Sequence, residues 1–164
     1  MLRKTWHIYE PENKDPYYYR SSKNYFMGMV RANVVLSNIL DMEDAKRQRI
    51  AADEIRSLPV QMLVDSGSYK LCINEAVQEV LQLPEIGRRL GQIATGKTVY
   101  FPEVGPVHLK FENRTVICTA LVLPGTAECL LGAIPMEEMD VLIDPLNEKL
   151  IVNPAHPNYA VLRV

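Results

Sequence analysis

The sequence predicts an all-β domain with one or two short helices. Between Met29 and Val152 the apolar residues form short runs, and Gly, Pro or Asn separates most of them, which is the pattern of short strands joined by turns. The alternating strands and long helices of a parallel α/β sheet are not seen. With 164 residues, the chain is long enough for one domain with a hydrophobic core.

The first expected strands precede the middle of the chain. Residue types alternate from position 30 to position 39 with the two-residue period of a strand. A charged segment, Asp41 to Arg49, follows and indicates a solvated hairpin or a helical turn. A second strand is expected from Ile55 to Val64. The residues assigned to one face of the first strand are Val30, Ala32, Val34, Leu36 and Asn38.

The helix signals are short. Asn74 can cap a helix from Glu75 to Leu81, which Pro84 would close. A second helical stretch is expected at 135–139. The remaining strands are expected at 99–101, 107–111, 115–123, 141–143 and 150–152.

The composition limits which partners and which cellular compartment we expect for this chain. Hydrophobic residues make up 48% and charged residues 23%, with a net charge of −2. Such a balance gives no general attraction for nucleic acid or an anionic membrane. Three cysteines, Cys72, Cys118 and Cys129, are an odd number without close pairing. No apolar secretory core follows Met1, so we expect a reduced, cytoplasmic protein.

Residues 1–26 differ from the rest of the chain. They are polar and aromatic, with Trp6 and the triplet 17–19 of tyrosines, and no helix or strand period is sustained. We expect an extended or loosely packed arm, because chain ends usually behave so; contact with a partner is the alternative. The single domain would then occupy 27–164, with Met27 as another candidate start.

The most informative motif is the segment 62–68, Met-Leu-Val-Asp-Ser-Gly-Ser. An apolar strand stops at Asp65, a hydroxyl residue follows, and Gly67 allows a tight turn beneath the acid. A second apolar pair ends in glycine at Leu130-Leu131-Gly132, shortly before the helical stretch at 135–139. In these two marks the chain resembles the retropepsin-like aspartic proteases, the single-lobed relatives of the retroviral enzymes, from about Met29 to Pro154.

The resemblance implies a fold and a site. The fold would be an acid-protease barrel, acting as a symmetric homodimer on a peptide or protein substrate. A hairpin flap would lie at 88–104, the wall of the substrate groove would run from 116 to 128, and the second mark would cross beneath the Asp65 loop. The implied site residues are Asp65 as the catalytic acid, Ser66 and Gly67 as its support, and Ser68, Thr95, Gly96, Lys97, Thr126 and Ala127 as substrate-binding residues.

Aspartic protease chemistry needs two carboxylates that share one proton around a bound water. The chain offers one Asp in the required setting. Asp41, Asp44 and Asp53 lie in charged or polar surroundings, and Asp140 precedes an apolar run. Asp144 ends such a run but precedes Pro145. A twofold dimer that joins two Asp65 side chains supplies the pair, without cofactor or metal.

The chain departs from the retroviral pattern at two positions. Ala133 stands where arginine usually follows the second mark, and Ser68 replaces a small alanine after the catalytic motif. The first change removes a structural ion pair and the second adds a hydroxyl near the substrate. A non-catalytic dimeric module of the same fold, which binds a peptide or partner, is therefore the alternative function.

A third hypothesis, nucleotide binding, rests on the segment 91–98. Gly-Gln-Ile-Ala-Thr-Gly-Lys-Thr matches the P-loop pattern at every position. A P-loop needs a buried strand before it and a helix after it, so that the helix N-terminus holds phosphate. Pro102 and Pro106 follow among β-formers, which excludes that helix. The sequence therefore predicts a hairpin turn at Gly96-Lys97.

The remaining polar residues give weaker signals. His7, His108 and His156 show no metal-ligand spacing. His108 alternates with apolar residues and is expected to face solvent. Ser66 and Ser68 lack the Gly-x-Ser-x-Gly elbow of serine hydrolases. Cys72, between two apolar residues, is expected in the core.

Overall fold

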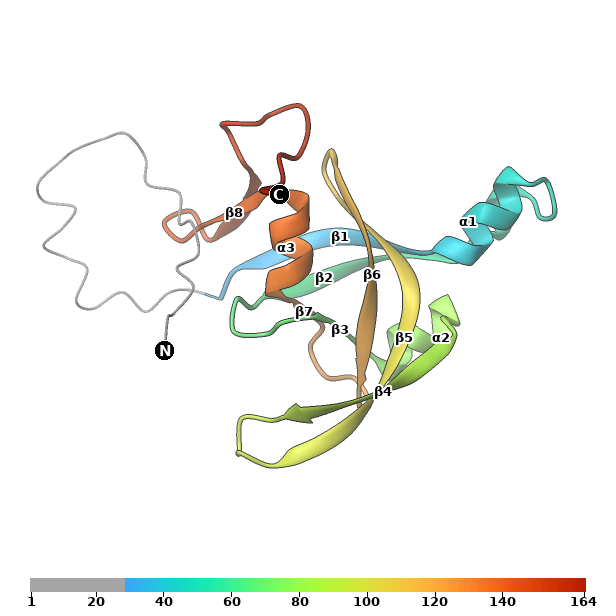
Figure 1. Cartoon of the computed structure of the whole chain (residues 1–164), viewed down its shortest axis with the longest axis horizontal. Helices are drawn as coiled ribbons and strands as arrows, with labels where there is room; N and C mark the ends of the chain where they lie inside the picture. The colour runs from blue at the N-terminus through green and yellow to red at the C-terminus, as the bar shows by residue number, and fades with distance from the viewer. Residues whose placement is uncertain (1–28) are drawn as a thin grey trace, which may run out of the picture.

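The computed structural model describes residues 29–164 and shows a protein built mostly from β-strands (Figure 1). The all-β prediction is confirmed at this level. Three short α-helices and one 3-10 helix accompany nine strands in this range, so the helices are more numerous than predicted. In chain order the elements are β1 Arg31–Asn38, α1 Ile39–Lys46, η1 Ala52–Glu54, β2 Ser57–Val64, β3 Leu71–Asn74, α2 Glu75–Leu81, β4 Glu85–Gln92, β5 Thr98–Phe111, β6 Arg114–Leu123, β7 Leu130–Leu131, α3 Ala133–Met139, β8 Val141–Asp144 and β9 Lys149–Val152.

Seven strands form one sheet in the order β1-β2-β7-β3-β6-β5-β4. Strand β1 pairs antiparallel with β2, and its last residues also pair antiparallel with β5. Because β1 has a partner on each side, the pairings of six strands close into a ring. Strand β4 pairs with β5 outside this ring, and the two project from it as a hairpin (Figure 1). Strands β8 and β9 form a separate antiparallel pair.

The hydrophobic core gathers the inward side chains of these strands. On β1 the predicted alternation is confirmed, since Ala32, Val34 and Leu36 are buried while the residues between them are exposed. Helices α2 and α3 cover the core with Leu81 and Met136, both almost fully buried. Each such aliphatic side chain stabilises the fold by about 1.5–3 kcal/mol.

The charged segment after β1 begins in a helix, one of the two predicted alternatives, but the burial of its first acid is not predicted by the sequence. Asn38 caps α1 by accepting hydrogen bonds from the amides of Leu40 and Asp41. Asp41 is buried, and its carboxylate accepts from the Arg56 guanidinium at 2.6 and 2.7 Å. These bonds hold the pKa of Asp41 below its usual value, although burial opposes them. Only the basic end of the segment is solvated as expected.

Helix α2 confirms its predicted cap. The Asn74 side chain accepts a hydrogen bond from the Val77 amide at 2.9 Å. The helix ends where Gln82 adopts a left-handed conformation with φ 47°. Its end thus lies before Pro84, which does not itself close the helix.

Two strand predictions need correction. The sequence predicts no strand at Leu71–Asn74, yet β3 pairs there with both β6 and β7. The separate strands predicted at 99–101 and 107–111 are one strand, β5, whose pairing with β6 shifts register between Val104 and Val107. That irregularity accommodates Pro106, which cannot donate to a regular ladder.

Among residues 29–164, no helix has the length and apolar character needed to cross a membrane. The arm predicted at 1–26 lies outside the described residues.

Candidate active site

Strand β2 delivers Asp65 to a position held from both sides. The Val64 amide donates to the Val30 carbonyl at 2.9 Å, and the Asp65 amide donates to the Leu131 carbonyl at 3.0 Å. The Leu63 amide also donates a hydrogen bond to the carbonyl of Cys129, which directly precedes β7. The backbone that carries the carboxylate is therefore fixed by Val30, directly before β1, on one side and by the chain around β7 on the other.

The turn after Asp65 orients its side chain. The Gly67 amide donates to Asp65 Oδ1 at 2.8 Å, and the Ser68 amide donates to the Asp65 carbonyl at 3.1 Å. A Cβ at Gly67 would lie 3.1 Å from Asp65 Oδ1, which is tight. Asp65 is half-buried and Ser66 is exposed. The loop thus holds the Asp65 carboxylate at its surface. Oδ1 accepts a backbone hydrogen bond, and Oδ2 has no hydrogen bond to any of the described residues.

The second mark lies directly beside this loop. Strand β7 runs between β2, to which it is parallel, and β3, to which it is antiparallel. A Cβ at Gly132 would lie 2.2 Å from the Lys70 carbonyl oxygen, so only glycine allows the two chains to approach so closely. The amides of Ala133 and Ile134 then donate to the carbonyls of Ser68 and Tyr69 at 2.7 and 3.0 Å. The Asp65 loop therefore rests on the first turn of α3.

Ser68 belongs to the same loop. Its hydroxyl donates to the Lys70 carbonyl at 3.2 Å and lies 3.8 Å from the Cys72 sulfur. The Ser68 hydroxyl thus has a bond within the loop itself. Its predicted contact with a substrate stays a prediction.

The predicted flap residues lie at the tip of the β4–β5 hairpin. The Gly96 amide donates to the Ile93 carbonyl at 2.8 Å, and the Ile93 amide donates to the Lys97 carbonyl at 2.9 Å. Gly96 has φ +83°, with open space where a Cβ would be. Thr95, Gly96 and Lys97 are exposed. The predicted turn is confirmed, and the helix that a P-loop needs is replaced by strand β5.

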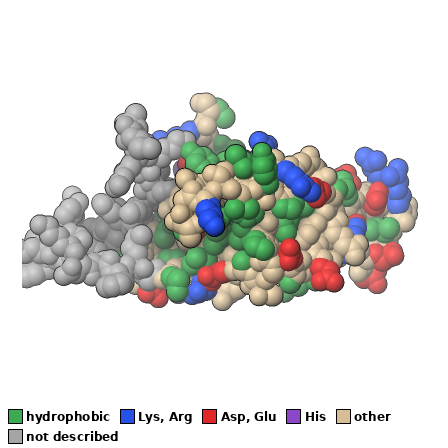
Figure 2. Space-filling model, turned by 90° about the horizontal axis from the view of Figure 1, so that it is seen from below, with side chains coloured by type: hydrophobic (Ala, Val, Ile, Leu, Met, Phe, Trp, Pro, Cys, Tyr) green, Lys and Arg blue, Asp and Glu red, His purple; other side chains and the backbone are tan. Residues whose placement is uncertain are grey.

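The hairpin carries apolar side chains that nothing in the described residues covers. Leu90 and Tyr100 face each other across the two strands, and both are exposed. Ile86, Ile93 and Val99 are exposed as well. Figure 2 views the molecule from the side on which this hairpin lies in Figure 1, and hydrophobic side chains are interspersed there with isolated charges.

Thr126 and Ala127 lie in the connection from β6 to β7. The Ala127 carbonyl accepts a hydrogen bond from the Asn74 side chain at 2.9 Å, while Thr126 is exposed. The Gly125 amide donates to Glu75 at 2.7 Å. These bonds fix the connection on the start of α2. No hydrogen bond in the described residues joins this connection or the hairpin tip to Asp65.

A charged cluster missed by the sequence analysis links the hairpin to the Asp65 loop. Glu103 of β5 is buried, and its carboxylate accepts from Lys70 Nζ at 2.5 Å, Arg89 Nε at 2.5 Å and Thr119 Oγ1 at 2.7 Å. The Lys70 bond is the main cause that lowers the pKa of Glu103 to about 2, although burial opposes it. Residue spacing gives no signal for this cluster, because its members are far apart in sequence.

The other Asp residues between 29 and 164 are engaged elsewhere or exposed. Asp140 accepts hydrogen bonds from the Asn153 side chain and the Val161 amide and lies 2.6 Å from His156 Nδ1. Asp144 caps the turn after β8 by accepting from the Leu146 and Asn147 amides. Asp44 pairs with Arg49, Asp41 pairs with Arg56, and Asp53 is exposed in η1. Asp144 resembles Asp65 in ending a strand and accepting from the amide two residues later, but its second oxygen also accepts a hydrogen bond, from the Asn147 side chain at 2.7 Å.

The three cysteines are free. Cys72 is buried in β3, which confirms its predicted place in the core. Burial raises the pKa of the Cys72 and Cys129 thiols and raises that of Cys118 to about 12. All three therefore stay protonated at neutral pH and behave as small apolar side chains.

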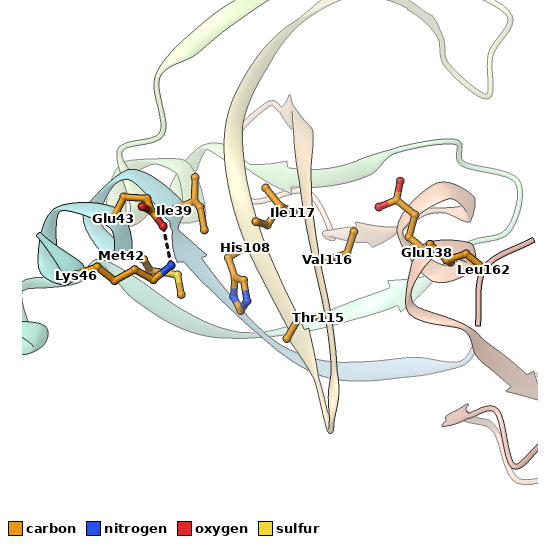
Figure 3. Close-up of a pocket in the computed structure, with 10 residues that line it drawn as sticks. All are labelled: Ile39, Met42, Glu43, Lys46, His108, Thr115, Val116, Ile117, Glu138 and Leu162. Carbon is orange, nitrogen blue, oxygen red and sulfur yellow. Dashed lines mark hydrogen bonds and ion pairs between the residues drawn. The ribbon is translucent and has the colours of Figure 1, made fainter. Parts of the chain in front are cut away.

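A separate open pocket of about 530 Å³ lies away from the Asp65 loop, with none of the loop residues in its walls. Figure 3 shows α1 side chains on one side, β5 and β6 along its floor, and Glu138 and Leu162 on the other side. His108 lies in it half-buried, so the solvent-facing prediction holds only in part. Burial, Lys110 and Lys46 lower the pKa of His108, which is therefore neutral at pH 7.

Within 29–164, no three His, Cys, Asp or Glu side chains gather where they could hold a metal ion. No known protein-family model matches the chain, and no curated protein shows a significant sequence match to it.

Proposed function

We propose that the protein is a retropepsin-like aspartic endopeptidase that acts as a homodimer. One observation carries the proposal: β7 lies between β2 and β3, and Gly132 packs against the Lys70 carbonyl, so that Asp65-Ser66-Gly67 sits at a strand end on a fixed backbone. The loop geometry fits a carboxylate that must keep its position during catalysis.

The proposed mechanism uses two Asp65 carboxylates and one water. Two neighbouring carboxyl groups in a dry site cannot both ionise easily, because their negative charges would repel each other. The pair therefore holds one proton between its oxygens. The ionised carboxylate takes a proton from the water, which attacks the peptide carbonyl carbon, while the protonated carboxyl donates a hydrogen bond to the carbonyl oxygen. The carboxyl that took the water proton then gives it to the amide nitrogen, the C–N bond breaks as the carbonyl re-forms, and the pair of carboxyls returns to one shared proton.

A dimer is required because each chain offers one such acid. The surface beside the Asp65 loop supports a subunit contact. Tyr69 and Ile134, joined by a backbone hydrogen bond, are both exposed apolar residues, at 72% and 40% of their full area. Burying such side chains against a second copy would stabilise the assembly.

The β4–β5 hairpin is the proposed flap. Its exposed apolar face, with Leu90 and Tyr100, could cover the peptide and exclude water from the reaction. The cytoplasmic location is part of the same proposal and is supported by the three free thiols.

The proposal is tested by Asp65→Asn and a peptide library. The wild-type protein is expected to cleave library peptides, and Asp65→Asn to lose at least about 10³-fold of that activity with an unchanged melting temperature, because the side chain keeps its size but not its charge. Asp53→Asn, which changes an exposed Asp in η1, is the matched control and should keep full activity.

The same experiment distinguishes the endopeptidase from the alternative function, a non-catalytic dimeric binding module. Cleavage that survives Asp65→Asn would show that another group or a contaminant does the chemistry. A wild-type protein that binds library peptides tightly but leaves them intact would favour the dimeric binding module.

A further inference from the structure

The Lys70–Glu103 cluster, defined as Lys70, Arg89, Glu103 and Thr119, joins three parts of the molecule. Arg89 lies in β4 and Glu103 in β5, which together form the hairpin, whereas Thr119 lies in β6. Lys70 follows the Asp65 loop directly, and its Nζ also donates to Thr119 Oγ1 at 2.7 Å. One buried carboxylate is thus shared by the hairpin, the ring and the loop.

The cluster lies where the hairpin is able to bend. The pairing of β4 with β5 shifts register between Glu85 and Gly87, and that of β5 with β6 shifts between Val104 and Val107. Such irregularities bend strands and interrupt regular pairing. Gly87 and Glu103 are paired residues at this level, so Glu103 lies between the two irregularities.

Burial changes at the same level. Glu103 and Val104 are buried, whereas β4 is mostly exposed, and from Leu90 through the tip to Tyr100 every hairpin residue except the half-buried Gly91 is exposed. The outer hairpin therefore has few contacts with the ring, and its base is the place that decides its orientation.

Lys70 can pass a movement of this base to the Asp65 loop. Its carbonyl accepts from the Ser68 hydroxyl and lies against Gly132, where a Cβ would be 2.2 Å away. A shift of the Lys70 backbone would therefore displace Ser68 or the start of α3, which support the turn that orients Asp65.

We propose that Glu103 is a positioning residue that couples the hairpin hinge to the Asp65 loop through Lys70. This role rests on the proposed endopeptidase function. Glu103 does not touch the reacting atoms; it sets the hairpin and the catalytic carboxylate in one arrangement, so that closure over a peptide and alignment of Asp65 occur together.

Hydrogen exchange of the full-length protein tests the coupling without any need for activity. Glu103→Gln keeps the size of the side chain and removes its charge. Exchange is expected to accelerate about tenfold or more both at 66–70 and at 86–102, because the shared anchor is lost. The matched control is Glu85→Gln, which removes an exposed carboxylate paired with Arg88 on the same hairpin and should leave 66–70 unchanged.

Kinetics separates positioning from a merely structural role. For a cleavable peptide, Glu103→Gln should lower kcat by about tenfold or more while KM changes less, since alignment of Asp65 is affected more than binding. If Glu103→Gln does not fold, Thr119→Val replaces it, because this isosteric change removes the hydroxyl that bridges Lys70 and Glu103.

Each outcome bears on one of the two proposals. Faster exchange in the hairpin with unchanged exchange at 66–70 overturns the coupling, as does an unchanged kcat in an active protein. If the wild-type chain cleaves no peptide but both segments still respond together, the endopeptidase function fails while the coupling stands.

Discussion

The Asp65 loop and the turn of the β4–β5 hairpin both match a known motif around glycine, yet their surroundings differ. The loop is bonded to β7 and to the start of α3, the strand end before it is bonded to Val30, and Gly132 beside it has no room for a side chain. The hairpin turn is bonded to itself, and Gly96 faces open space. One motif is fixed by the whole fold and the other by its own few residues.

This difference shows which of the two motifs has the structural surroundings that its pattern requires. The P-loop pattern at 91–98 is complete, but its residues form two strands and a turn, with no helix N-terminus to hold phosphate. The Asp-Ser-Gly pattern is short, but a second segment 65 residues away lies beside its loop, where Gly132 approaches the Lys70 backbone so closely that only glycine fits. Context at long range therefore outweighs the length of a match.

The largest expected difference between the two regions is the stability lost when a glycine of each is replaced by alanine. Gly132→Ala should lower the free energy of unfolding by more than about 3 kcal/mol, because the new Cβ meets backbone that cannot move away. Gly96→Ala, where only the positive φ opposes a side chain, should cost about 1 kcal/mol. Urea denaturation of both variants measures the difference. Equal losses would mean that the approach of Gly132 to Lys70 does not constrain the loop.

Acid should weaken the cluster beside the loop. The pKa of Glu103 falls from its usual value to about 2 in the folded protein, so its contribution is complete above the unfolded pKa of about 4.5 and is lost as pH falls toward about 2. Between these limits the wild-type protein should lose about 2 kcal/mol more stability than Glu103→Gln. Urea denaturation at several pH values measures this difference, and parallel profiles would contradict it.

Nucleotide should have the smallest effect. ATP or GTP with magnesium at millimolar concentration should leave the melting temperature unchanged, because Gly96-Lys97-Thr98 leads into β5 rather than a helix. Lys97→Ala should behave identically. A magnesium-dependent rise in melting temperature that Lys97→Ala abolishes would restore the nucleotide hypothesis.

The sequence predicts the parts of this protein that depend on near neighbours. The alternation on β1 marks its buried face, and Asn74 marks the start of α2 because a cap acts on amides within three residues. Asp65 is visible because a strand end, a hydroxyl and a glycine follow one another directly.

The sequence does not predict the strands and ion pairs that depend on residues far away along the chain. Strand β3 has only four residues and takes its partners from β6 and β7, so no local period reveals it. Asp41 looks solvated until Arg56, fifteen residues later, is placed beside it. The Lys70–Glu103 pair spans 33 residues. Such pairings arise from the topology and cannot be derived from spacing.

The central claim is that each active site takes one Asp65 from each of two chains. Wild-type and Asp65→Asn chains are mixed in equal amounts, exchanged fully and assayed on a cleavable peptide. Random pairing leaves about a quarter of the dimers with two intact acids, and a mixed dimer lacks one of them. The account predicts activity of about a quarter of the undiluted wild-type value. Activity near half would show that each chain carries a complete site and would contradict the account.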